Sequence, residues 1–311
     1  MASPPLYLAE PRARSNDYPS TFVGIANPNI FRCRSVVGYW ELRVLGELVF
    51  VGLGLYDEKD VSLRGLEEAR KADFVFAEFY TSLMLGLSIQ KLEELVGKKV
   101  SVVSRQTLEE EEGKPILQEA KKRKVAFLVP GDPLIATTHV DLRIRAEKQG
   151  IKTRVIHEAS IVSTIIKLSG LQNYKYGRSV TIPFPEKGFA SETPYKVILE
   201  NRVMGLHTLC YLDIKAEERR YMTVKEGLQS LLDMEKQKRG HVITLSTLFL
   251  GVARAGSDNP TVKAGYVGDV MNHNFGPPPH TLVFPAKLHF MEAEALITLA
   301  GAPEQVRGMV E

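Results

Sequence analysis

Cysteine and net charge are both scarce in this chain. Only two of its 311 residues are cysteine, and the net charge is +3 at pH 7. Cys33 and Cys210 lie far apart in the sequence and show no metal-ligand spacing. We therefore expect both to be free thiols in a reducing cytoplasm. The small charge argues against a general nucleic-acid-binding surface, so no direct binding of nucleic acid is expected.

Long apolar runs are absent as well. No stretch reaches the ~20 apolar residues that a membrane-spanning helix needs. The N-terminus has no basic start followed by an apolar segment, so a secretory signal is not expected. The sequence thus predicts a cytoplasmic protein that does not bind membranes.

Several short catalytic motifs are also missing. No Gly-Lys-Ser/Thr sequence follows a glycine-rich turn, and the zincin, Gly-x-Ser-x-Gly and paired-cysteine patterns do not occur. No two histidines have the i, i+4 spacing that places metal ligands on one helix face. No metal site is predicted.

Two glycine-containing loops are the most informative features that are present. Gly52-Leu-Gly54 follows the apolar run Leu48–Val51, and Gly131-Asp-Pro-Leu134 follows Val125–Pro130. Such runs predict buried strands, and open α/β sheets bind ligands at the carboxyl ends of their parallel strands. The third glycine of the dinucleotide fingerprint would fall at Asp57, which disfavours a nicotinamide site. The loops predict a different nucleotide-like cofactor, lying across the edge of the sheet.

Strand and helix patterns alternate from residue 48 onward. The expected strands are 48–51, 73–77, 99–104, 125–130 and 152–157, and the expected helices are 63–72, 89–95, 116–123 and 139–149. This alternation predicts βαβ units with a parallel sheet. After Gly170, the residues Pro183, Pro185, Gly188 and Pro194 predict a long irregular connection. Beyond it we expect strands at 207–214, 248–253 and 281–285, and a helix from a capping box at Thr223–Glu226 through Met234.

Composition divides the chain into three regions. Residues 1–46 are rich in proline and show no periodicity, so we expect a disordered N-terminal extension. Residues 47–165 are predicted to form an N-terminal α/β domain, and residues 166–311 a C-terminal α/β domain.

Asp132 and His280 are the polar residues with the most specific local settings. Asp132 lies between a glycine and a proline at a strand end, where its carboxylate can face a ligand donor. The alternative is that it caps the segment Leu134–His139. His280 follows three prolines and precedes a strand, which predicts a rigid loop at a sheet edge, although a purely structural histidine is the alternative.

The order of several segments is distinctive when they are taken together. These segments are Gly52–Asp57, Ala77–Ser82, Pro130–His139, Leu142–Arg145, Leu212–Ala216, Ala253–Ser257 and Asn259–Thr261. They resemble the tetrapyrrole-methylase-like (class III) methyltransferases, and the resemblance covers about residues 47–305. The chain differs at His157-Glu-Ala-Ser160, where many relatives have Pro-Gly-Ile-Ser.

The resemblance implies two α/β domains of the tetrapyrrole methylase type, with S-adenosylmethionine in the cleft between them and S-adenosylhomocysteine as the product. It implies cofactor contacts by Leu55, Asp132, Ile135, Ser160, Ile161, Leu212, Ala255 and His280. Within the superfamily it is closest to members that act on translation elongation factor 2. It therefore implies successive N-methylation, to the trimethylammonium, of a 3-amino-3-carboxypropyl-modified histidine in diphthamide biosynthesis. A homodimer is implied as well.

Methyl transfer of this kind needs alignment of the reacting atoms and exclusion of water more than covalent catalysis. The sequence identifies no catalytic residue, and only His139 and Asp132 are candidates for a base. Three alternatives remain open. They are another class III methyltransferase acting on a tetrapyrrole or other small molecule, a nicotinamide oxidoreductase, and a non-catalytic module that binds the translation factor.

Overall fold

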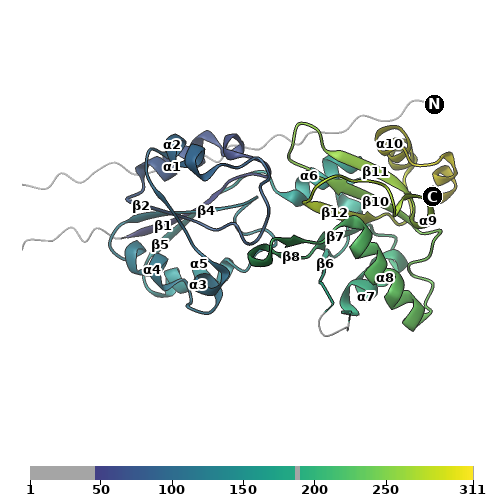
Figure 1. Ribbon diagram of the computed structural model, residues 1–311, viewed down its shortest axis with the longest axis horizontal. Helices are drawn as coiled ribbons and strands as arrows, with labels where there is room; N and C mark the ends of the chain where they lie inside the picture. The colour runs from purple at the N-terminus through teal and green to yellow at the C-terminus, as the bar shows by residue number, and fades with distance from the viewer. Residues whose placement is uncertain (1–45, 186–189, 311) are drawn as a thin grey trace, which may run out of the picture. The chain divides into compact units, whose positions relative to one another are not determined.

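The computed structural model describes residues 46–185 and 190–310. The predicted N-terminal extension, residues 1–46, lies outside the described residues except for Gly46, and so does Cys33. The described residues belong to one unit, Val44–Glu311, and they form two five-stranded sheets with helices on both faces of each (Figure 1).

The first sheet is entirely parallel, as predicted. Its order is β3-β2-β4-β1-β5. The strands are β1 (Glu47–Gly52), β2 (Phe74–Ala77), β3 (Val100–Val102), β4 (Lys124–Val129) and β5 (Lys152–Ile156). The central strands β1 and β4 are buried along almost their whole length, which explains their uninterrupted apolar runs.

Helices cover this sheet on both faces. One face carries α1 (Leu63–Lys71) and α2 (Ile89–Val96), and the other carries α3 (Arg105–Glu109), α4 (Lys114–Ala120) and α5 (Val140–Lys148) (Figure 1). A 3-10 turn, η1 (Glu58–Asp60), precedes α1. The side chains of Ser62, Ser88 and Ser104 cap α1, α2 and α3 by accepting backbone N–H groups.

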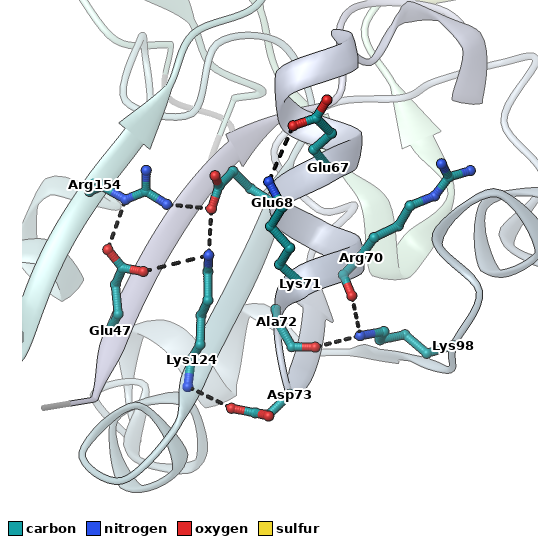
Figure 2. A network of polar contacts seen from close by, with 10 residues as sticks. All are labelled: Glu47, Glu67, Glu68, Arg70, Lys71, Ala72, Asp73, Lys98, Lys124 and Arg154. Atoms are coloured by element: carbon teal, nitrogen blue, oxygen red, sulfur yellow. Dashed lines mark hydrogen bonds and ion pairs between the residues drawn. The ribbon is translucent and has the colours of Figure 1, made fainter. Parts of the chain in front are cut away.

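A charged network closes the amino-end edge of the first sheet (Figure 2). Glu47 pairs with Arg154 at 2.8 Å and with Lys124 at 3.7 Å. Glu68 of α1 accepts hydrogen bonds from Arg154 and from Lys124, the latter at 2.6 Å. Burial raises the pKa of Glu68, but these hydrogen bonds outweigh it and the pKa is lowered. The network fastens α1 to β1, β4 and β5 at the edge opposite the glycine loops.

The second sheet is mixed, with the order β11-β10-β12-β7-β6. Its strands are β6 (Val180–Ile182), β7 (Thr208–Leu212), β10 (Leu248–Ala253), β11 (Thr261–Tyr266) and β12 (His280–Phe284). Only β6 and β7 run parallel, and the other neighbours are antiparallel. A short hairpin, β8 (Ile214–Lys215) and β9 (Arg220–Tyr221), follows β7 around the 3-10 turn η3 (Ala216–Glu218).

The irregular connection predicted after Gly170 is partly wrong. That region contains η2 (Asn173–Lys175), strand β6 and helix α7 (Thr193–Val203). Pro194 lies in the first turn of α7, where its missing N–H costs no intrahelical hydrogen bond. A proline there marks the start of a helix and does not interrupt one.

The second sheet is also covered on both faces. One face carries α6 (Ile161–Ser169), α10 (Phe290–Ala300) and η4 (Glu304–Met309), and the other carries α7, α8 (Val224–Lys238) and α9 (Val267–Val270). The capping box of Thr223 and Glu226 is confirmed, although the helix runs on to Lys238 and does not end at Met234. Ile165 of α6 packs in the core of the second sheet. The domain division at residues 165/166 stays a prediction.

Candidate functional site

A cavity of about 510 Å³ lies between the carboxyl-end edge of the first sheet and one edge of the second. Cavities of this size hold cofactor-sized ligands. All the residues that the resemblance assigned to the cofactor line this one cavity, namely Leu55, Asp132, Ile135, Ser160, Ile161, Leu212, Ala255 and His280. Their function as cofactor contacts stays a prediction, but the fold does bring them together.

The two glycine loops are hydrogen-bonded to each other. The amide of Gly131 donates to the carbonyl of Gly54 at 2.6 Å. Both glycines have positive φ, +76° at Gly54 and +71° at Gly131, which favours glycine over other residues. A Cβ at Gly52 would lie 2.4 Å from Cβ of Glu158. The space above Gly52 is thus filled by protein, and a glycine here lets the loops after β4 and β5 approach the end of β1.

Asp132 fastens the loop after β4 to the loop after β5. Its Oδ2 lies 3.2 Å from Nδ1 of His157 and accepts the amide N–H of Glu158 at 3.3 Å. The Asp132 side chain makes no hydrogen bond to the 134–139 segment among the described residues, so it does not cap that segment. The carboxylate lies at the cavity wall with its side chain 12% exposed.

The loop after β5 leads directly into α6. The hydroxyl of Ser160 caps the helix by accepting the amide N–H of Val162 at 3.1 Å. The carboxylate of Glu158 accepts the amide N–H of Ser62 at 2.5 Å, which links this loop to the start of α1. Glu158 and Ser160 thus each hold this loop by a specific hydrogen bond.

The register of the second sheet places Leu212 and His280 side by side. Because β12 is antiparallel to β7 and β10, its first residue lies where those two strands end. His280 pairs with Ala253, the last residue of β10, and the next residue, Thr281, pairs with Tyr211 of β7. Leu212 and His280 therefore meet at one edge of the sheet.

His280 is held by both ring nitrogens. Nδ1 accepts the amide N–H of Val224 at 3.2 Å, and Nε2 donates to the carbonyl of Gly276 at 3.1 Å. Burial lowers the pKa of His280, which keeps the imidazole neutral near pH 7. Because both ring nitrogens are occupied, His280 can contact a ligand only through its backbone and the faces of its ring.

Arg254 does not line the cavity but positions one of its loops, and sequence reasoning missed this. Its backbone has φ +52° and its amide donates to the carbonyl of Pro279 at 2.9 Å. Its guanidinium donates to the carbonyls of Phe275 and Pro277 at 2.8 and 2.9 Å. These bonds hold the proline loop ahead of His280. The residue lies within Ala253–Ser257, one of the distinctive segments, but no local pattern predicts a positive φ at an arginine.

His139, one of the two candidate bases, is not among the residues that line the cavity. Its side chain is 2% exposed, and its Nε2 lies 3.1 Å from Oε1 of the buried Glu78. Glu78 also accepts the amides of Tyr80 and Thr81 at 2.9 and 3.0 Å. The prediction for His139 is therefore wrong, because the pair lies outside the cavity lining and holds the backbone of Tyr80 and Thr81.

Comparison with known proteins identifies the family. The family model of the tetrapyrrole (corrin/porphyrin) methylases matches residues 47–262. The chain belongs to the tetrapyrrole methylase family. The resemblance seen in the sequence is thereby confirmed, and the chain is a methyltransferase.

Relatives within the tetrapyrrole methylase family are highly similar. A diphthine synthase of Methanosarcina barkeri is 51% identical over 261 residues, which cover 82% of this chain and 97% of the relative. A diphthine synthase of Methanocaldococcus jannaschii is 47% identical over 251 residues, which cover 80% of this chain and 97% of the relative. A crystal structure of diphthine synthase superposes with a TM-score of 0.77 at 40% identity and covers 85% of this chain and 100% of that one. The two-sheet α/β architecture is thus the family's own fold, as predicted.

Two kinds of feature are absent from the described residues. Within 46–185 and 190–310, no cluster of His, Cys, Asp or Glu could hold a metal ion. Across the same ranges, none of the helices combines the length and the apolar composition needed to cross a bilayer.

Proposed function

We propose that this tetrapyrrole methylase family member is a diphthine synthase. It transfers methyl groups from S-adenosylmethionine to the amino nitrogen of a 3-amino-3-carboxypropyl-modified histidine in elongation factor 2, and it repeats the transfer up to the trimethylammonium. The observation that carries this proposal is that residues next to both sheets, all implied as cofactor contacts, line the same cavity. The names of the most similar relatives support the same activity.

The cavity residues fit the cofactor chemically. Leu55, Ile135 and Leu212 offer apolar surface to a purine ring, and Asp132 offers a carboxylate for a ribose or an ammonium group. If bound here, S-adenosylmethionine would supply the methyl group: the neutral amine would form the new N–C bond while the C–S bond breaks with its electron pair going to sulfur, and the methylated nitrogen would lose its proton to solvent before the next transfer. This chain's residues align the partners and exclude water, and such alignment can supply ~7–11 kcal/mol in favourable cases.

A labelled-methyl assay tests the proposal. We expect label from S-adenosylmethionine to appear on elongation factor 2 that carries the precursor, and not on the factor with an unmodified histidine. Transfer to a tetrapyrrole, or affinity for NADH in place of S-adenosylmethionine, would contradict it. So would binding of the factor without any affinity for the cofactor. The cavity disfavours a tetrapyrrole, because such acceptors carry several carboxylates and Arg105 is the only arginine or lysine among its described lining residues.

We further propose that the enzyme acts in the cytoplasm, where elongation factor 2 works, as a homodimer. Sedimentation equilibrium of the purified protein tests the homodimer. A measured mass of 34.7 kDa, which is that of one chain, at micromolar concentration would contradict it.

A further inference from the structure

The cavity has a second polar wall that none of the implied cofactor contacts uses. Four residues form this wall: Tyr80, Arg105, Glu109 and Thr138. Arg105 and Glu109 stand four residues apart on α3, so their side chains leave the same face of the helix. No ion pair joins them, and the wall therefore presents one positive and one negative group separately.

Arg105 has no charged partner among the described residues. Its guanidinium lies over the ring of Tyr80, 5.1 Å from the ring centre. Contact with an aromatic face leaves the N–H groups of an arginine available to a carboxylate. An arginine without an ion pair at a cavity wall is suited to bind an anionic group of a ligand.

Tyr80 supplies an independent observation. Its side chain is only 6% exposed, and its hydroxyl oxygen makes no hydrogen bond of normal geometry among the described residues, although the side chain of Thr138 lies close enough to act on its pKa. Burial, together with the charges of Glu78 and Glu109, raises the pKa of Tyr80, so the hydroxyl stays protonated and can donate. Buried polar groups without partners are rare in native proteins, and at a cavity wall such a group indicates a ligand acceptor.

Glu109 completes the wall. Its Oε1 accepts a hydrogen bond from the hydroxyl of Thr138 at 3.4 Å, which leaves the other carboxylate oxygen available. The wall thus offers a cationic group, a hydroxyl donor and an anionic group from residues that line the same cavity. This arrangement complements an amino-acid head, in which a carboxylate and an amine share one carbon.

We propose that this wall binds the free amino-acid head of the acceptor, with Arg105 and Tyr80 on its carboxylate and Glu109 facing its amino nitrogen. The inference rests on the proposed function, since the 3-amino-3-carboxypropyl group ends in such a head. Glu109 then stabilises the positive charge that the nitrogen gains with each methyl group. The methionine part of S-adenosylmethionine carries the same head, so the experiment must separate the two sources.

The test is the steady-state kinetics of Arg105→Gln with modified elongation factor 2, together with calorimetry of S-adenosylmethionine binding. We expect the KM for the factor to rise about tenfold or more, because a charge-assisted hydrogen bond is lost. The cofactor Kd should stay within about twofold of wild type. Arg105→Lys, which keeps the charge without the planar fork, should recover part of the loss.

Arg123→Gln is the matched control. Arg123 lies over the ring of Phe74 at 5.0 Å, nearly the geometry of Arg105 over Tyr80, but at the amino-end edge of the sheet, away from the cavity. We expect it to change neither the KM nor the cofactor Kd.

Tyr80→Phe separates ligand binding from folding. We expect a smaller rise of the KM, while the free energy of unfolding stays equal or increases, because an unpartnered buried hydroxyl is removed. A KM unchanged in both Arg105→Gln and Tyr80→Phe would overturn the proposal. A weakened cofactor Kd with an unchanged KM would assign the wall to S-adenosylmethionine and overturn it too. If instead the proposed function is wrong, the wild type itself will transfer no methyl group to the factor, and this outcome differs from both of the above.

Discussion

Single side chains hold the cavity loops in place, and Asp132 illustrates this at the residue scale. One of its carboxylate oxygens contacts both His157 and the amide of Glu158, so the loop after β4 is fastened to the loop after β5. Hydrogen bonds to a charged group are worth about 1.5–3 kcal/mol. Loss of this carboxylate should therefore affect the loops and the ligand together.

Asp132→Ala should weaken S-adenosylmethionine binding by about tenfold to a hundredfold, measured by calorimetry. Asp73→Ala is the control, because its carboxylate also accepts a backbone amide, that of Lys124 at 2.9 Å, but at the opposite edge of the sheet. Equal affinities in the two variants would contradict a part for Asp132 in the cofactor site.

At the scale of elements, the cavity depends on how closely two loops approach. Gly256, in the loop after β10, packs against Leu55, in the loop after β1, and a Cβ at position 256 would lie 2.4 Å from Cβ of Leu55. The loop after β1 and the loop after β10 thus contact each other at a position that only glycine fills without displacement.

Gly256→Ala should therefore push these loops apart. We expect a loss of stability of about 1–3 kcal/mol from overpacking, and a weaker cofactor Kd because Leu55 moves. Gly308→Ala is the matched control, since nothing lies within 4 Å of a Cβ at that position. An unchanged cofactor Kd in Gly256→Ala would show that the loop contact does not shape the site.

At the scale of the whole molecule, stability depends on a buried polar cluster behind the second sheet. Glu292 of α10 is fully buried, with Oε1 3.0 Å from Nε2 of His207 and Oε2 2.9 Å from Nζ of Lys175. Burial raises the pKa of Glu292, but the backbone donors of Gln172 and His289, with Lys175 and His207, outweigh it and lower the pKa to about 2. Burial also lowers the pKa of His207, against the opposing charge of Glu292.

Both shifts predict loss of stability in acid. A lowered pKa means that the unfolded chain binds more protons than the folded one, so the free energy of unfolding decreases as the pH falls. For His207 the decrease begins near its ordinary pKa of 6.5, and for Glu292 it begins near 4.5 and continues to about 2. Urea unfolding at pH 7, 5.5 and 4 measures this, and stability that stayed constant over that range would contradict it.

Glu292→Gln should cost about 3 kcal/mol at pH 7, because it leaves buried partners without their anion. It should also weaken the pH dependence below pH 5, to which Glu68 still contributes. Glu294→Gln, on the same helix but in an exposed ion pair with Arg307, should change little.

Much of the fold could be predicted because its signals are local. The strands of the first sheet, the capping box of α8 and strand β10 follow from apolar runs and from a four-residue pattern. The elements that were missed have weak local signals. Strand β6 has only three residues, and α7 starts at a proline that resembled a breaker. The wrong prediction for His139 has the same origin, because burial beneath a cavity wall leaves no trace in neighbouring residues.

The sequence by itself determined the strand–loop–helix order, the parallel first sheet, the family and, through the resemblance, eight of the residues that line the cavity. These follow from patterns over a few residues or from motifs in a set order. The tertiary structure alone decided which polar groups meet: Asp132 with His157, His280 with the amide of Val224, and Arg105 with Tyr80. Each pair joins residues that lie more than 20 positions apart in the chain. Their meeting depends on strand order and register, which arise only when both sheets have formed.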